Sequence, residues 1–219
     1  EALIRWTDEE GQAISPAMFI PAAERTGIQK RVDNWVMSTA ARQAFEWRQM
    51  GLDIPIAINL SARSFMDPNL VSTMEALITL WGIDHGSLQL EVTETALMSD
   101  PEQASEICKQ LRDLDIELSI DDFGTGQSSM AYLRDLSVTH VKIDQSFVMQ
   151  MATDPGNAAI VKSVIELGSS LGKNLIAEGV EDEPTAKLLT ELGCEIAQGW
   201  KYSKAIPANE WTAWLETAP

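Results

Sequence analysis

The sequence has few of the residues that build disulfide frameworks or zinc cages. Of 219 residues, two are cysteines, Cys108 and Cys194, and two are histidines, His85 and His140. Two cysteines are too few for the disulfide scaffold of a small secreted domain, and neither histidine has a partner at metal-ligand spacing. We therefore expect the cysteines to be buried apolar residues and the histidines to be structural.

Long apolar runs and clusters of positive charge are also missing. Apolar runs such as "LITLW" are far shorter than a membrane span, and no signal peptide is visible, so we expect no membrane contact by this domain. The net charge is −17, from 33 acidic and 16 basic residues. Such a surface repels duplex nucleic acid, whereas a small anion could still bind through metal cations.

What the sequence does contain is an alternation of short apolar runs and longer helical patterns. The runs predicted as strands are Ala2–Trp6, Ile54–Ser61, Leu88–Glu94, Ile116–Phe123, Thr139–Asp144, Asn174–Val180 and Cys194–Trp200. The predicted helices are Arg31–Met50, Asn69–Trp81, Pro101–Leu114, Asn157–Leu171, Glu183–Leu192 and Ala208–Leu215. In the first helix, the spacing places Val32, Val36, Ala40 and Phe45 on the inner face. Alternation of this kind predicts an α/β fold with a parallel sheet.

The length and composition fit one α/β barrel. Hydrophobic residues make up 45% of the chain, which is enough for a sizeable core. A (β/α)8 barrel needs eight strands and the pattern supplies seven, so we expect the first strand upstream of Glu1. We interpret residues 1–219 as a single domain, taken from a larger multidomain protein.

Each predicted strand brings polar residues to its carboxyl end or just beyond. They are Glu1 and Arg5, Asn59 and Ser61, Glu91 and Glu94, Asp121 and Asp122, Lys142 and Asp144, Glu178 and Glu181, and Gln198. Barrel enzymes build their active sites at this rim. One acid at a strand end is ordinarily a cap or a solvated residue, but repetition over seven strands favours a functional site.

A ring of carboxylates repels itself unless cations neutralise it. Oxygen ligands from Asp, Glu and Asn suit Mg²⁺ or Mn²⁺, and the lack of cysteine and histidine ligands argues against zinc. Two such ions form the arrangement that serves phosphoester hydrolysis.

Seven segments resemble the motifs of the EAL domain family, in order and in approximate spacing. They are "EALIRW", "AINLSARSF", "LEVTE", "IDDFGTGQSSMAYL", "VKIDQSFV", "AEGVE" and "GCEIAQGWKYSKAIP". The family consists of phosphodiesterases for the bacterial messenger cyclic di-GMP, with degenerate members that bind it or act as scaffolds. The resemblance implies a modified TIM barrel with one antiparallel strand near its start.

The resemblance also implies roles for individual residues. The metal ligands would be Glu1, Asn59, Glu91, Asp121 and Glu178, with Asp122 and Asp144 helping to hold the second metal. The catalytic set would be Lys142, Glu1, Glu178 and Glu94, the last anchoring the glycine-rich loop. Substrate contacts would come from Leu3, Arg5, Asp144, Glu181 and Gln198.

The function implied is metal-dependent hydrolysis of cyclic di-GMP to linear pGpG, with two Mg²⁺ or Mn²⁺ ions per site. Lys142 would act either as general base or as an electrostatic stabiliser. A receptor that binds the dinucleotide without turnover is the main alternative. A sugar-cleaving barrel with paired carboxylates is a weaker one, since it does not explain Asn59 and Lys142 together.

Three positions depart from the family pattern: Ser64, Gln127 and Ala205. None is a metal ligand or the lysine, so we expect an active enzyme whose activity Gln127 could tune. The resemblance further implies a homodimer through Ser128–Asp135 and the helix after "VKID". It also implies possible GGDEF, sensor or membrane domains elsewhere in the full-length chain, and a location in the bacterial cytoplasm.

Overall fold

A computed structural model of the chain describes residues 1–125 and 130–215. The chain divides into two compact units. The first contains Glu1–Ile120 and Ser128–Thr139, and the second contains Asp121–Gln127 and His140–Pro219. The boundary falls within one strand, so the strand runs from the first unit into the second.

Parallel β-structure forms the core of the fold, as predicted. Among the described residues the main sheet has six strands in the order β3-β4-β5-β6-β7-β8. They are β3 (Ile56–Asn59), β4 (Leu88–Thr93), β5 (Glu117–Phe123), β6 (His140–Ile143), β7 (Asn174–Ala177) and β8 (Ile196–Ala197). In-register parallel pairing joins β3 to β4, β6 to β7 and β7 to β8. The six predicted strands after the first are therefore confirmed.

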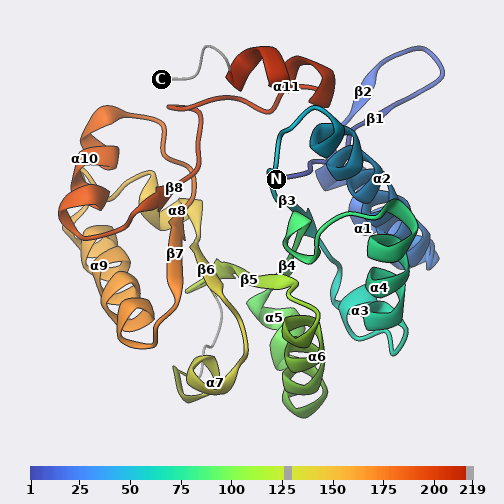
Figure 1. Cartoon of the computed structure of the whole chain (residues 1–219). Helices are drawn as coiled ribbons and strands as arrows, with labels where there is room; N and C mark the ends of the chain where they lie inside the picture. Colours follow the sequence, from blue (N-terminus) through green and yellow to red (C-terminus); the bar gives the residue numbers. More distant parts are fainter. Residues whose placement is uncertain (126–129, 216–219) are drawn as a thin grey trace. The chain divides into compact units, whose positions relative to one another are not determined.

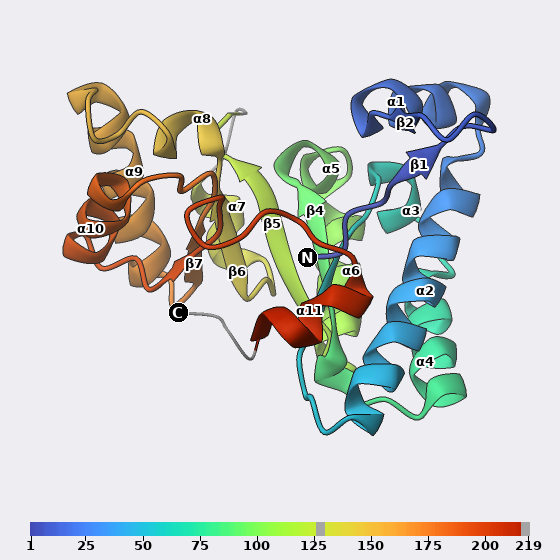
Figure 2. The same cartoon turned by 90° about the horizontal axis from the view of Figure 1, so that it is seen from above.

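The first unit surrounds its strands with helices. These are α1 (Pro16–Thr26), α2 (Gln29–Gln49), α3 (Ala62–Phe65), α4 (Leu70–Trp81), η1 (His85–Ser87), α5 (Glu94–Met98), α6 (Pro101–Asp113) and α7 (Met130–Asp135). The long helix α2 packs on α4 and β3 and lies beside α4 in both views (Figures 1 and 2). Ile58 on β3 and Leu88 and Leu90 on β4 are completely buried.

The predicted first strand, Ala2–Trp6, was wrong over most of its length. Ala2 alone forms a parallel bridge, to Ile58. The chain then turns into an antiparallel hairpin of β1 (Trp6–Thr7) and β2 (Ala13–Ile14). In the turn of this hairpin, the Asp8 carboxylate accepts a hydrogen bond from the Gln12 backbone amide.

The inner face of α2 also differs from the prediction. The buried residues of this helix are Gln29, Asp33, Met37, Ala40, Ala41, Ala44 and Trp47. Val32, Val36 and Phe45 are only partly buried. The buried face is offset by about one residue from the apolar set, and it includes a polar side chain, Asp33. Apolar periodicity predicts core positions for apolar residues only.

The second unit contains β6, β7 and β8 together with four helices among its described residues. These helices are α8 (Gln145–Val148), α9 (Pro155–Ser170), α10 (Glu183–Glu191) and α11 (Ala208–Leu215). Asp154 and Asp182 cap the starts of α9 and α10, and proline occupies the first turn of each. Helix α9 packs on β7, as Figure 1 shows. No described helix is long and apolar enough to span a membrane.

Gly199 permits a close backbone approach after β8, and this predicts a strong effect of Gly199→Ala. A Cβ at this position would lie 2.2 Å from the Val180 oxygen and 2.3 Å from the Val180 nitrogen. Because backbone cannot move aside cheaply, we expect a loss of about 1–3 kcal/mol in the free energy of unfolding, measured by urea denaturation.

Gly86→Ala is the matched control for this experiment. A Cβ on Gly86 meets no heavy atom within 4 Å. The control should unfold within about 0.5 kcal/mol of the parent chain. Equal midpoints for the parent and the Gly199 variant would contradict the steric argument.

Candidate active site

A buried lysine lies at the centre of the second unit's polar residues. Lys142 is on β6, and its side chain is 1% exposed. Its Nζ lies 2.8 Å from Glu178 Oε1 and 3.5 Å from Asp121 Oδ1. A buried ammonium is costly without such partners. The structure therefore brings together three residues that the sequence analysis placed in the site.

Two neighbouring aspartates on β5 join Glu178 in a compact acidic group. Oxygens from Asp121, Asp122 and Glu178 all lie within 4.8 Å of one another. Successive strand residues normally point to opposite faces. Asp122, however, has a left-handed backbone with φ of 54°, and its carbonyl accepts hydrogen bonds from the Thr125 amide and hydroxyl. This local turn explains how two adjacent carboxylates share one site.

The environment of Asp122 disfavours its ionised form. Its pKa is raised, first because partial burial removes water from the carboxylate and then because Asp121 and Asp144 place negative charge nearby. A hydrogen bond with Asp144 raises it further, while Lys142 opposes the shift. Asp144 is itself buried and caps α8 through Ser146. The unfavourable charge at Asp122 is what a bound cation would relieve.

The first unit holds the other predicted metal ligands. Asn59 ends β3 and is paired in register with Glu91 on β4. The Asn59 Nδ2 donates a hydrogen bond of 2.6 Å to Glu1 Oε1, which leaves the Asn59 Oδ1 as the amide's acceptor for a ligand. Glu91 is 3% exposed. Three oxygen donors from the first unit thus come from neighbouring segments.

Glu94, the predicted loop anchor, begins α5 and is buried. Its Oε2 has no hydrogen-bond partner in the part of the chain that the structure describes. Such a group is costly to leave unpaired. Gln127 and the first residues of the predicted dimer segment lie outside the described residues.

The predicted substrate contacts differ in exposure. Leu3 is 44% exposed, and the Arg5 guanidinium donates a hydrogen bond to the Ile4 carbonyl. Glu181 is exposed. The backbone of Gln198 bonds to Ala177 and Val180, which fixes its position after β8. A ligand can therefore reach exposed residues such as Leu3 and Glu181 without any unfolding of the core.

Asp33 is a buried polar residue that the sequence patterns did not predict. Asp33 is buried on α2 and bonds to Ser61, just beyond Asn59. The available signal was an acid at helical spacing from the apolar residues Met37 and Ala40.

Comparison with known proteins decides the family. A model of the EAL domain matches residues 1–205. The chain belongs to the EAL domain family. This EAL domain is 39% identical over 211 residues to the bifunctional diguanylate cyclase/cyclic di-GMP phosphodiesterase MucR of Pseudomonas aeruginosa. It is 35% identical over 215 residues to another cyclic di-GMP phosphodiesterase of that organism.

The two relatives are much longer than this chain. The alignments cover 96% and 98% of the EAL domain but only 31% and 37% of the relatives. Among solved structures, the PaMucR phosphodiesterase in complex with c-di-GMP matches with a TM-score of 0.91 and 38% identity. That match covers 94% of this chain and 84% of the other. The expected family and its α/β barrel-type fold are therefore confirmed.

The raised pKa of Asp122 predicts how Asp122→Asn changes stability with pH. Folding disfavours the ionised carboxylate, so the parent loses stability as the pH rises from the unfolded pKa through the higher folded pKa. With a chelator present, the neutral variant should therefore be more stable than the parent at pH 7, and the difference should vanish near pH 3. Thermal melts across this range measure it. A variant less stable at pH 7 would contradict the prediction.

Proposed function

We propose that this EAL domain hydrolyses cyclic di-GMP to linear pGpG and depends on two Mg²⁺ or Mn²⁺ ions. The observation that carries the proposal is the buried Lys142, which pairs with Asp121 and Glu178 beside Asp122. Similarity to proteins named as cyclic di-GMP phosphodiesterases supports the choice of substrate.

The donor atoms fit these cations. Every candidate ligand offers a carboxylate or amide oxygen, which Mg²⁺ and Mn²⁺ prefer. We assign as ligands the residues Glu1, Asn59, Glu91, Asp121, Asp122, Asp144 and Glu178. When bound, the ions would neutralise phosphate oxygens and make a water molecule more acidic. The short distances within the group Asp121, Asp122 and Glu178 support its part in this assignment.

We propose that Lys142 acts as a fixed positive charge and hydrogen-bond donor. Two carboxylates at 2.8 and 3.5 Å from its Nζ favour the charged ammonium, which has no lone pair for accepting a proton. In this state Lys142 can orient the attacking water and stabilise charge that develops on the phosphoryl oxygens. This favours electrostatic stabilisation over the general-base role.

The remaining predicted residues are proposed to bind and enclose the substrate. The exposed Leu3 would contact a guanine, and the Arg5 guanidinium would meet a phosphate oxygen. Glu181 and Gln198 would contact the nucleotide. Glu94, whose buried Oε2 lacks a partner among residues 1–125 and 130–215, would anchor the glycine-rich loop and thereby help to assemble the site.

The setting of this activity is also a proposal. We propose that the domain works in the bacterial cytoplasm as a homodimer and within a longer protein. The much greater length of the matched relatives supports the last point. Additional domains of the GGDEF, sensor or membrane type would then control the activity.

A turnover assay tests the function directly. Purified protein is incubated with cyclic di-GMP and Mg²⁺ or Mn²⁺, and the nucleotides are separated by chromatography. We expect linear pGpG as product, no product in excess EDTA, and recovery when the cation is restored. Binding of cyclic di-GMP without any pGpG would instead assign the domain to the receptor class.

Replacement of Lys142 tests the proposed charge at the reaction centre. Lys142→Ala should lower turnover by about 100-fold or more, because a preorganised charge is lost. Binding of cyclic di-GMP, measured by calorimetry, should remain detectable. Lys142→Met keeps the side-chain volume and should show the same loss.

The matched control is Lys162→Ala, which removes an exposed lysine paired with Glu166 on α9. This variant should turn over like the parent chain. Parent-like turnover by both Lys142 variants would refute the assignment.

A further inference from the structure

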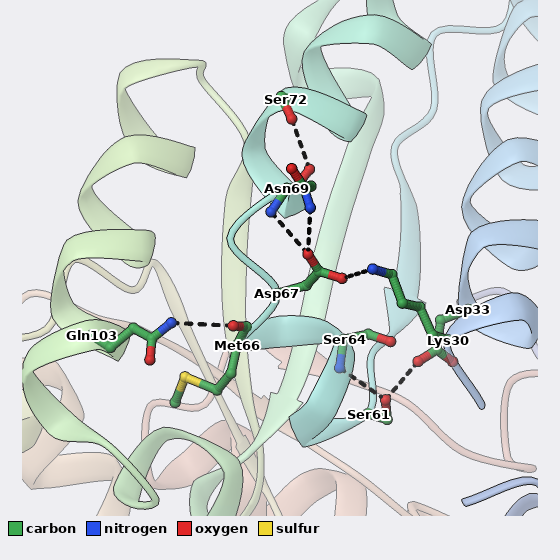
Figure 3. Close-up of polar contacts among 9 residues, drawn as sticks. All are labelled: Lys30, Asp33, Ser61, Ser64, Met66, Asp67, Asn69, Ser72 and Gln103. Carbon is green, nitrogen blue, oxygen red and sulfur yellow. Dashed lines mark hydrogen bonds and ion pairs between the residues drawn. The ribbon is translucent and has the colours of Figure 1, made fainter. Parts of the chain in front are cut away.

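A buried carboxylate on α2 faces the turn that leads from β3 into α3 (Figure 3). Asp33 is only 3% exposed. One of its oxygens accepts a hydrogen bond of 2.8 Å from Gln29 Nε2, and the other accepts one of 2.6 Å from the Ser61 hydroxyl. Burial of a carboxylate is tolerated only when it is bonded in this way. Asp33 and Ser61 therefore constrain each other.

Ser61 connects this contact to the candidate metal site. It is the N-cap of α3, its Oγ accepts a hydrogen bond from the Ser64 amide, and it follows Asn59 by two residues. The intervening Leu60 amide donates to the Glu91 carbonyl at 2.8 Å. The short segment after Asn59 is thus held by β4 on one side and by Asp33 on the other.

The short helix α3 that follows this turn borders a pocket. The pocket has a volume of about 160 Å³ and is lined by Ser64 of α3 and by Lys30, Asn34 and Met37 of α2, among others. The Ser64 hydroxyl is buried and lacks a hydrogen-bond partner within the described part of the chain. The bond from Asp33 gives the Ser61 hydroxyl a directional contact with α2.

We propose that Asp33 is a positioning residue for the metal site and acts through Ser61 on Asn59. The inference rests on the proposed function, in which Asn59 is a metal ligand. The Asn59 Nδ2 is already bonded to Glu1, so a fixed backbone at Asn59 aims its Oδ1 in one direction. Without the hydrogen bond to Asp33, the turn can rotate, and the Asn59 Oδ1 then occupies a wider range of positions.

Affinity for Mn²⁺ tests this role without any turnover. The whole chain is freed of metal, and Mn²⁺ binding is measured by calorimetry in the absence of nucleotide. Asp33→Leu has similar volume but accepts no hydrogen bond, so Mn²⁺ should bind about 10-fold more weakly. Ser61→Ala removes the other partner and should weaken binding to a similar degree. The double variant should be no weaker than either single one, because both break the same link.

Conservative variants separate positioning from a general loss of stability. Ser61→Thr keeps the hydroxyl and should bind Mn²⁺ like the parent chain. Asp33→Asn should also retain binding, because its amide oxygen can accept from Ser61. If the Gln29 side-chain amide flips, the amide nitrogen that this substitution introduces can donate a hydrogen bond to Gln29 Oε1. This oxygen has no partner among the described residues of the parent chain.

Asp67→Asn, in the loop between α3 and α4, is the matched control. Asp67 pairs with Lys30 on α2 and accepts from the Asn69 amide, but it does not contact Ser61 (Figure 3). The pKa of Asp67 is lowered, first by the bond from Lys30, so loss of the charge should lower the melting temperature. Its Mn²⁺ affinity should stay within about twofold of the parent value, since the link to Asn59 is intact.

These measurements distinguish a failure of the inferred role of Asp33 from a failure of the proposed function. Parent-like Mn²⁺ affinity in Asp33→Leu would overturn the inference, as would an equal loss in Asp67→Asn. A parent chain that binds no Mn²⁺ would overturn both the inference and the proposed function. Mn²⁺ binding that depends on Asp33, in a parent chain that forms no pGpG from cyclic di-GMP, would support the inference and overturn the proposed hydrolysis.

Discussion

Negative charges at the ends of neighbouring strands cannot remain together unless positive charge meets them. In the second unit, Lys142 supplies part of that compensation from within the sheet, where it is almost completely buried between Asp121 and Glu178. The pKa of Asp122 is raised first by burial and then by the charges of Asp121 and Asp144, and Lys142 only partly opposes this shift. A site with an unbalanced excess of oxygen donors is suited to divalent cations. The cation dependence that we propose follows from this imbalance.

A second buried charge, Asp33, solves a different problem in the first unit. Lys142 pairs with carboxylates that can also bind a ligand, whereas Asp33 receives hydrogen bonds from neutral groups that serve the fold. Both residues occupy positions that apolar side chains would fill more cheaply. Each buried charge supports the end of a strand. Lys142 lies beside carboxylates at the ends of β5 and β7, and Asp33 lies beside the turn after β3.

Prediction from the sequence succeeded where the signal was repeated and failed where one local contact decided the outcome. Six strands followed from their apolar runs, but the Ala2–Trp6 strand failed because a polar turn formed a hairpin. Helix α1 was missed, although Ser15, Pro16 and the left-handed Gly27 mark its ends. On α2, the apolar periodicity could not reveal that Asp33 would be buried, because its burial depends on hydrogen bonds from Gln29 and Ser61.

The sequence by itself determined the family, the alternation of strands and helices, and the set of oxygen donors, because motif order and residue chemistry are written along the chain. Tertiary structure alone decided which donors approach one another. The left-handed turn at Asp122 gathers two adjacent carboxylates, and the register of β3 with β4 pairs Asn59 with Glu91. Distances and burial depend on how segments far apart in the sequence pack, and this packing is what makes Lys142 a shielded charge and Asp33 a fixed support.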